Sequence, residues 1–370
     1  MNRIIYIVSS PRNEGSIAVN GPEKRVFRMV SSGELDDFRV EVVYPDYGKL
    51  IFPNLKNLRI HISGIKHKYD FRFWLFLFKS IQNWDGRTVI HVQGPPSLDF
   101  IAVIFGLLKG YRVIVTRPLP LYLEQYGFFM KFILRTLDWI SLKLASEIIV
   151  QNSQMYKIYV SLYGIRKVNL VYNGVESYPE MRSRLSSSNL LKIFYTAQFV
   201  DRKNHDFIID LADYMLQRGF DNFKFHLVGG GPNFQKIADN IAYRNLNEHI
   251  VLNGFQSDPR SLYNGLSIYF SPSLQEGMSV ACLEALSVGM PIVAFDAGGM
   301  QDIIQHGESG FIITRSEKVD DNLKELCFNY FLALSEVHLN LEFSQKTILH
   351  FEKHFTFQSY LKSYRYFYEK

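Results

Sequence analysis

The most informative stretch for the fold is Pro272-Ser273-Leu274-Gln275-Glu276-Gly277-Met278-Ser279-Val280-Ala281-Cys282-Leu283-Glu284-Ala285-Leu286. It has the composition of a strand end, a glycine turn and the start of a helix. Its two carboxylates, Glu276 and Glu284, stand eight positions apart on either side of the helix start. Helix-start amides can bind a diphosphate, and a carboxylate accepts hydrogen bonds from sugar hydroxyls. The stretch therefore indicates a site for an anionic, polyhydroxylated ligand.

Apolar runs alternate with amphipathic segments along the chain, which predicts parallel sheets covered by helices. In the first half, strands are expected at residues 4–8, 38–43, 88–92, 111–115 and 147–151, and helices at residues 98–109 and 127–145. In the second half, strands are expected at residues 191–197, 224–228, 249–252, 267–271 and 291–295, and helices at residues 206–217 and 233–244. The economical interpretation is two α/β domains.

The polar, serine-rich residues 181–189 are typical of a linker. We expect an N-terminal domain at residues 1–175, a second domain at residues 176–345 that contains the candidate ligand site, and a C-terminal helix at residues 346–370 that returns to the N-terminal domain. Thr356 is a candidate helix cap, after which Tyr360, Tyr364 and Phe367 share one face. Ligands of open parallel sheets bind at the carboxyl ends of the strands, so the chemistry is expected in a cleft between two facing domains.

Composition limits the class of protein. The 370 residues are 47% hydrophobic, enough for two cores, and the two cysteines suit neither a disulfide framework nor a zinc site. A reducing cytoplasm is expected, because the apolar run at residues 4–8 is too short for a signal peptide or a spanning helix. Residues 1–180 carry 23 Lys and Arg against 15 Asp and Glu, whereas the remainder carries 18 against 21. The basic, aromatic surface of this half could favour anionic lipid. A charge imbalance that serves no partner explains the counts equally well.

The two glutamates also have ordinary explanations. Glu276 could compensate a helix dipole, and Glu284 could be a solvated helix residue. Ser279 is a good helix cap, and the amides of residues 278–281 would then emerge beside Gly277, where no side chain blocks approach. This combination favours a ligand site over chance.

The stretch from Glu276 to Pro291 resembles the E-x7-E region of the family 4 retaining glycosyltransferases, which have the two-domain GT-B fold. Four further segments are similar to that family, at residues 172–176, 225–232, 251–255 and 296–302, although Asp302 stands where glutamate is commoner. The resemblance is strong over residues 168–313 and weak before them. It implies that Glu284 binds the ribose hydroxyls, that Glu276 contacts the donor sugar, and that the backbone of Gly277, Met278, Ser279 and Val280 meets the diphosphate or sugar.

A second candidate loop spans residues 197–205, after an expected strand and before an expected helix. A lysine here can neutralise the charge that grows on a leaving diphosphate. The family normally supplies an arginine and a lysine from this loop; Lys203 matches the lysine, but Gln198 occupies the arginine position. Arg202 could substitute for the arginine or could be an exposed basic turn. Gly230 lies in a glycine run that permits close backbone approach.

Three residues of the N-terminal half are weaker candidates for the acceptor side of the cleft. Gly21 lies in a loop that weakly resembles the first glycine loop of the family, and a plain surface loop is as compatible. His91 ends an expected strand, although a lone histidine is more often structural. Arg117 stands near the place of a family histidine and could bind an anionic acceptor.

The expected function is a retaining transfer of a sugar from a nucleotide-diphosphate donor to a glycan or lipid-linked acceptor in surface polysaccharide synthesis. No metal and no cofactor is expected, because the chain has no D-x-D triplet. Two aromatic stretches, at residues 71–79 and 128–135, could touch a bilayer or simply pack on a sheet, which leaves the inner face of the membrane open as a location. The alternatives are an epimerase or phosphorylase on the same fold and a non-catalytic sugar-nucleotide-binding subunit, which Gln198 would favour. Dispersed basic residues argue against nucleic acid.

Overall fold

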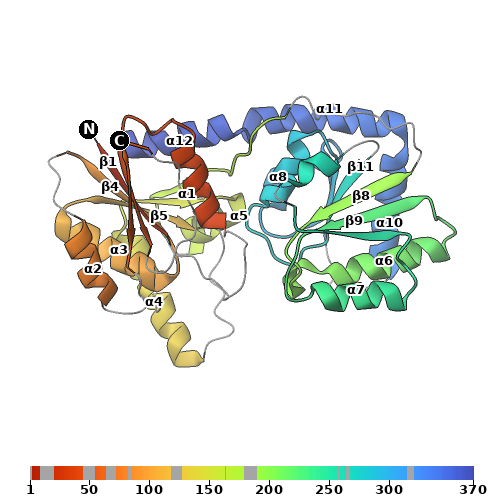
Figure 1. Cartoon of the computed structure of the whole chain (residues 1–370), viewed down its shortest axis with the longest axis horizontal. Coiled ribbons are helices and arrows are strands. Elements are labelled where there is room, and N and C mark those ends of the chain that lie inside the picture. The colour runs from red at the N-terminus through yellow and green to blue at the C-terminus, as the bar shows by residue number, and fades with distance from the viewer. Residues whose placement is uncertain are drawn as a thin grey trace. The chain divides into compact units, whose positions relative to one another are not determined.

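The computed structural model describes residues 2–8, 21–44, 55–63, 72–81, 86–117, 127–162, 164–178, 190–256, 258–263, 267–314 and 321–370. The chain divides into two compact units. Unit 1 comprises Met1–Val171 and Leu361–Lys370, and unit 2 comprises Tyr172–Tyr360 (Figure 1). The division therefore falls close to the expected boundary at residue 175. The linker predicted at residues 181–189 lies outside the described residues.

Unit 1 contains a parallel sheet with the strand order β3-β2-β1-β4-β5-β6-β7. Its described strands are β1 (Arg3–Val8), β2 (Arg39–Tyr44), β3 (Leu58–Ile62), β4 (Thr88–Gln93), β5 (Arg112–Arg117), β6 (Glu147–Val150) and β7 (Val168–Leu170). Its helices are α1 (Gly21–Ser31), α2 (Arg72–Ser80), α3 (Pro96–Lys109), α4 (Phe128–Leu144) and α5 (Ser153–Lys157), and a π-helical turn follows at Ile158–Leu162. The sequence did not reveal β3 and β7, because β3 is largely exposed and β7 has three residues.

Unit 2 repeats this plan with the strand order β10-β9-β8-β11-β12-β13. Its described strands are β8 (Leu191–Thr196), β9 (Phe223–Val228), β10 (Ile250–Gly254), β11 (Ser267–Ser271), β12 (Ile292–Phe295) and β13 (Gly310–Ile313). Its helices are α6 (His205–Gln217), α7 (Phe234–Tyr243), α8 (Val280–Ser287), α9 (Met300–Ile303), α10 (Asp321–Ser335) and α11 (Val337–His354), with 3-10 turns at Asp201–Lys203 and Pro259–Leu262. The five predicted strands of this half are confirmed.

Each sheet has one place where the chain order reverses, between β1 and β4 in unit 1 and between β8 and β11 in unit 2. The loops that leave neighbouring strands at such a point diverge to opposite faces of the sheet, and the crevice between them is where open α/β sheets bind ligands. In unit 2 these loops are residues 197–204, which contain the candidate Lys203, and residues 272–279, which contain the candidate Glu276. In unit 1 the loop after β1 lies outside the described residues.

The C-terminal region consists of two helices, where a single helix was expected. Helix α11 ends at His354, and α12 (Phe357–Glu369) begins after Thr356, whose hydroxyl accepts a hydrogen bond from the Ser359 amide at 3.3 Å. The predicted cap at Thr356 is therefore confirmed. Tyr360, Tyr364 and Phe367 are all buried, as their common helix face suggested.

Within the described part of the chain, every helix is too short or too polar to cross a bilayer.

Candidate active site

The two loops that follow β8 and β11 are joined by backbone contacts. The Leu274 amide donates to the Arg202 carbonyl at 2.8 Å, and the Asn204 side chain donates to the Pro272 carbonyl at 3.2 Å. Asn204 itself has a left-handed backbone, with φ at 56°, which an asparagine tolerates better than most residues. These contacts bring the lysine loop and the glutamate loop together at the switch point of the sheet.

Lys203 and Glu276 form an ion pair between the two loops. The side chains are 12% and 9% exposed, so the pair is largely withdrawn from water. The Ser273 hydroxyl also donates to Glu276 Oε1 at 2.9 Å. Because Lys203 and Ser273 both contact the Glu276 carboxylate, they hold it in one orientation. The same ion pair holds the Lys203 ammonium group at the carboxyl end of the sheet. The structure thus unites the two residues that the sequence proposed for chemistry.

Tyr195 contacts Lys203 and Ser273 and was not identified from the sequence. Its hydroxyl donates to the Lys203 carbonyl at 2.9 Å and lies 2.7 Å from the Ser273 hydroxyl. Complete burial, reinforced by the negative charge of Glu276, raises the pKa of Tyr195 well above its ordinary value, so the phenol stays protonated. Tyr195 and Ser273 are 78 positions apart, and nothing in the local sequence links them.

His205 adds an apolar wall beside the lysine. Its ring stacks on Phe199 with centroids 4.0 Å apart, and burial, with a smaller effect of the Lys203 charge, lowers its pKa to about 4. The imidazole is therefore neutral near pH 7 and adds no second positive charge. No role for this histidine was predicted from the sequence, because its burial depends on the packing of α6.

Helix α8 begins as predicted. Ser279 is its N-cap and accepts from the Cys282 amide at 3.4 Å. The first amides of a helix have no acceptor within it, so the start of α8 presents donors immediately after the Glu276 loop. Glu284 lies one turn further along and is half-buried. Met278 is 6% exposed, whereas the Val280 side chain faces solvent. Gly277 is buried.

The loop after β12 packs against the backbone of Glu276 and Gly277. The Gly299 amide donates to the Gly277 carbonyl at 2.8 Å. At Gly298, φ is +62° and a Cβ would lie 1.9 Å from the Glu276 carbonyl oxygen. Only glycine avoids both the left-handed strain and this collision. Gly298 is thus required for the close approach of the two loops.

Replacement of Gly298 by alanine is expected to lower the free energy of unfolding by about 2 kcal/mol or more, from backbone strain plus the collision. Gly307→Ala is the matched control, because Gly307 also has a left-handed φ of +80° but its Cβ would meet no atom within 4 Å. Urea unfolding of the two variants separates collision from strain. Equal losses would show that the contact with Glu276 does not constrain the loop.

The segment that enters unit 2 also contacts the glutamate loop. The Asn173 side chain donates to the Met278 carbonyl at 3.3 Å, and the Tyr172 hydroxyl donates to Asp302 Oδ1 at 3.2 Å. Burial, with a smaller effect of the Asp302 charge, raises the pKa of Tyr172 to about 12. Three of the segments that carry the family resemblance, those containing Tyr172, Met278 and Asp302, are therefore neighbours in the folded chain.

The remaining donor-side candidates of unit 2 lie near this arrangement with differing exposure. Gln198 and Arg202 are exposed on the loop after β8. Gly230 follows β9, and a Cβ built on it would meet no described atom within 4 Å, which leaves its surface open to a ligand.

No group of three or more His, Cys, Asp or Glu side chains gathers as a metal site among the residues that the structure describes.

His91 lies inside unit 1, whereas the sequence suggested a position facing the cleft. It is 5% exposed; Nδ1 is 2.7 Å from the Tyr368 hydroxyl and Nε2 is 2.8 Å from the Thr116 hydroxyl. Burial, with a smaller effect of the Arg25 charge, lowers its pKa to about 3. The neutral ring thus joins β4 to β5 and α12, and both nitrogens are already engaged. This corrects the suggestion that His91 is available to an acceptor.

Arg117 is also an internal residue, and its suggested role in binding an anionic acceptor needs correction. It is 2% exposed and forms ion pairs with Asp99 and Asp138, which are buried as well. It also donates to the Gly94 carbonyl at 3.1 Å. A buried guanidinium requires such partners, and two carboxylates around one cation leave no excess positive charge to attract an anion.

Gly21 is the first residue of α1, and the loop before it lies outside the described residues. Further along this helix, Arg25 donates to the Gln151 side chain at 2.8 Å, just beyond the carboxyl end of β6. The same end of the sheet holds Gln93, whose amide nitrogen is buried without a described partner. These three polar residues, Arg25, Gln151 and Gln93, which the sequence did not single out, thus lie at the end of the sheet where open parallel sheets bind ligands.

The environment of His91 predicts a pH effect on stability. The pKa is about 3 in the folded unit and about 6.5 in the unfolded chain, so below pH 6.5 only the unfolded state gains the proton and stability falls as pH falls. From about pH 7 to about pH 5, wild type should lose about 2 kcal/mol more unfolding free energy than His91→Gln. Tryptophan fluorescence in urea measures unit 1, because Trp74, Trp84 and Trp139 all lie in it. Equal losses would contradict the buried neutral histidine.

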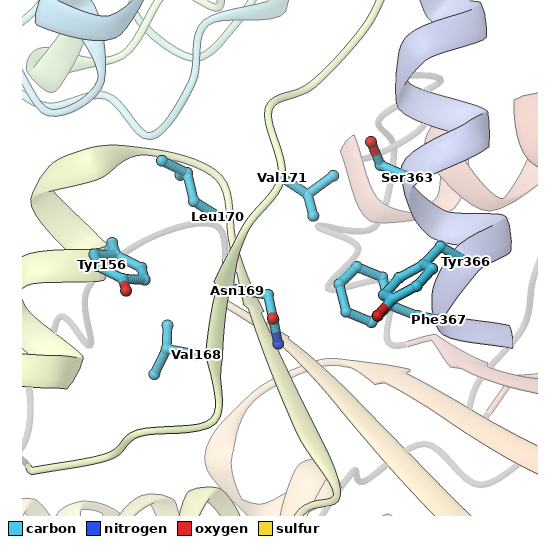
Figure 2. A pocket seen from close by; sticks show the side chains of 8 residues that line it. All are labelled: Tyr156, Val168, Asn169, Leu170, Val171, Ser363, Tyr366 and Phe367. Atoms are coloured by element: carbon cyan, nitrogen blue, oxygen red, sulfur yellow. The ribbon is translucent and has the colours of Figure 1, made fainter. Parts of the chain in front are cut away.

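Unit 1 also contains an open cavity of about 480 Å³ between β7, α5 and α12 (Figure 2). Tyr366 and Phe367 line it from α12, and Tyr156 and Asn169 line it from the other side. The Asn169 amide nitrogen donates to Glu147 at 2.9 Å and so serves the sheet itself. None of the site residues proposed from the sequence lines this cavity.

Comparison with known proteins identifies the class to which this fold and site belong. Residues 178–328 match the family model described as "Glycosyl transferases group 1", and residues 19–177 match the one described as "Glycosyltransferase Family 4". The paired parallel sheets are those of a GT-B transferase fold. The chain belongs to glycosyltransferase family 4.

Relatives agree with this assignment, and a solved structure has the same fold. The poly(ribitol-phosphate) alpha-N-acetylglucosaminyltransferase of Staphylococcus aureus strain COL is 26% identical over 52% of this chain, and the match spans 41% of that protein. The capsular polysaccharide biosynthesis glycosyltransferase CapM of Staphylococcus aureus is 23% identical over 73% of this chain and 80% of its own length. The structure of HepE from Anabaena in complex with UDP superposes with a TM-score of 0.71 over 98% of both chains, at 15% identity.

Proposed function

We propose that this protein transfers a sugar, with retention of anomeric configuration and without a metal ion, from a nucleotide-diphosphate donor to a glycan or lipid-linked acceptor. The Lys203–Glu276 pair at the switch point of unit 2, followed directly by the start of α8, carries this proposal. The names of the relatives, which act on ribitol phosphate polymer or in capsular polysaccharide synthesis, support an acceptor in a surface polysaccharide. The UDP of the HepE complex supports a nucleotide donor.

In this proposal Glu284 accepts hydrogen bonds from the ribose hydroxyls, and the diphosphate lies at the amides that begin α8. Lys203 donates to the diphosphate, and Glu276 shares its carboxylate between the ammonium group and the hydroxyls of the donor sugar. Gly230 and Gly277 leave room for the ligand. Arg202 and Gln198 lie at the rim of this site as exposed, secondary contacts.

The proposed reaction forms a bond between the acceptor hydroxyl oxygen and the anomeric carbon on the face from which the diphosphate leaves. The bond from the anomeric carbon to the phosphate oxygen breaks, and that oxygen receives the proton of the acceptor hydroxyl. Lys203 stabilises the negative charge that develops on the diphosphate, which is electrostatic catalysis by a group already in position. Tyr195 and Ser273 are positioning residues in this scheme, because they hold the lysine and the glutamate.

Gln198 favours one second candidate, a sugar-nucleotide-binding subunit without turnover. With a neutral amide at the place of a cation, fewer positive charges face the leaving diphosphate, and its departure is less well stabilised. Such a protein would bind donors as the enzyme does but would not consume them.

One set of experiments tests these proposals. A panel of nucleotide sugars is screened by thermal shift, since a bound donor raises the melting temperature by mass action, and the stabilising donor is then incubated with surface-polysaccharide acceptors. NMR of the product reports its anomeric configuration, and EDTA treatment tests metal independence. Inversion, or loss of activity in EDTA, would refute the mechanism. Binding without any product would favour the non-catalytic subunit, and consumption of donor without acceptor would favour an epimerase.

A further inference from the structure

The first turns of α4 expose an unusual group of large apolar side chains in unit 1. Phe128 is 89% exposed, Phe129 is 74% exposed and Phe132 is 63% exposed, with Met130 beside them at 45%. These are four of the first five residues of the helix. Exposed patches of this kind on a folded protein mark surfaces that meet another apolar phase or another molecule.

The position of α4 explains why these side chains have no cover within the described part of unit 1. Its buried residues, Leu134, Asp138, Ser141 and Leu142, all lie in the later turns of the helix. Figure 1 shows one end of α4 extending away from the sheet of its unit. The helix therefore packs through its C-terminal part, and the aromatic N-terminal part reaches beyond the strands.

The charges of α4 indicate what this surface meets. Its described basic side chains are Lys131, Arg135 and Lys143, and Arg135 and Lys143 are exposed. Its one acidic residue, Asp138, is buried and paired with Arg117, so it does not offset the basic surface. Trp139 is 48% exposed, and the Lys143 ammonium group lies 5.8 Å from the centre of its ring. The exposed face thus combines aromatic side chains with cations and carries no exposed carboxylate.

We propose that this α4 face, formed by Phe128, Phe129, Met130, Phe132 and the basic side chains beside them, docks on the surface of an anionic lipid bilayer. Aromatic rings enter the boundary between headgroups and acyl chains, while lysine and arginine remain at the level of the headgroup phosphates. Each basic residue near an anionic surface adds to the attraction. No described helix is long and apolar enough to span the membrane, so the contact is peripheral.

The α4 face lies near the end of the unit 1 sheet at which an acceptor is expected to bind. Helix α4 follows β5 along the chain, and its start lies toward the carboxyl end of that strand, the end at which parallel sheets bind ligands. A lipid-linked acceptor would therefore reach unit 1 from the membrane on which α4 rests. This last step depends on the proposed transferase activity; the bilayer contact itself does not.

Vesicle flotation of the whole chain tests the contact without any glycosyl donor. The probes are vesicles of phosphatidylcholine alone and vesicles with added phosphatidylglycerol. We expect flotation with the anionic vesicles and at least about tenfold weaker partition for the variant Phe128→Ser/Phe129→Ser/Phe132→Ser. Lys131→Glu/Arg135→Glu should also lose binding. The serine variant should melt like wild type because its changed side chains are exposed, and the glutamate variant should do so because Arg135 is exposed and Lys131 is only half-buried. The matched control is Tyr243→Ser/Phe255→Ser, which removes rings that are 87% and 62% exposed in unit 2.

Three outcomes would overturn the proposal. In the first, the wild-type protein does not float with anionic vesicles. In the second, the triple serine variant floats as well as wild type. In the third, the control variant Tyr243→Ser/Phe255→Ser loses as much binding as the triple serine variant. Sedimentation of the free protein adds a fourth, because a dimer that the serine changes dissociate, without lipid binding, would assign the α4 face to a second copy of the chain. Donor binding by the serine variant, measured by thermal shift, distinguishes a failure of docking from a failure of the transferase assignment.

Discussion

Replacement of Lys203 by alanine is expected to reduce turnover by about a hundredfold to a thousandfold, the usual effect of removing one preorganised group that stabilises transition-state charge. The fold should survive, because the hydrogen bond from Tyr195 reaches the backbone carbonyl of Lys203 and is independent of its side chain. Glu276 also keeps the hydrogen bond from Ser273. The effect should therefore appear in the rate of the chemical step at saturating donor.

The matched control for this experiment is Lys236→Ala. Lys236 also forms an ion pair in unit 2, with Asp206, but its side chain is 63% exposed, and such pairs contribute little. Single-turnover rates with the donor found in the screen, together with melting temperatures, separate chemistry from folding. If Lys203→Ala turns over at a near-normal rate, Lys203 has no part in catalysis.

Replacement of Glu284 by alanine is expected to weaken the affinity for the nucleoside diphosphate by roughly 10- to 150-fold. One charge-assisted hydrogen bond contributes about 1.5–3 kcal/mol, which corresponds to this range. Alanine is also the better helix former within α8, and the melting temperature of the variant shows whether its fold is kept. Calorimetric titration with the nucleoside diphosphate of the stabilising donor measures the effect.

Two further variants define the origin of that loss. Glu284→Gln keeps an acceptor oxygen but not the charge, so its affinity should lie between those of wild type and Glu284→Ala. Glu325→Ala removes a glutamate that is 46% exposed on α10 and paired with Arg218, and it should bind normally. Unchanged affinity in Glu284→Ala would remove this residue from the nucleotide site.

The donor side of the candidate site was largely predictable because its parts are local in sequence. A serine cap, a glycine turn and a carboxylate one helical turn later occupy one stretch, and backbone geometry alone places them at a helix start. The pairing of Lys203 with Glu276 follows once both loops are assigned to neighbouring parallel strands. The support from Tyr195 was not predictable, because its partners come from two other loops.

The N-terminal candidates show where local reasoning ends. Arg117 is the last residue of β5, so its position along the sheet was inferred correctly, whereas His91 lies two residues before the end of β4. The direction of neither side chain was inferred correctly, since it depends on which helix covers that face. Tyr368 of α12 reaches His91 from 277 positions away, and two aspartates of α3 and α4 surround Arg117.

The sequence by itself determined the alternation of strands and helices, the repeat of one α/β plan, and the helix start that follows Glu276. These depend on hydrophobic periodicity and on capping, which act over a few residues. The tertiary structure alone decided which polar groups meet: the Lys203–Glu276 pair, the collision that only glycine avoids at residue 298, and the burial of His91 and Arg117. Such contacts join residues that are distant along the chain, and the strand order that brings them together is a property of the packed sheets.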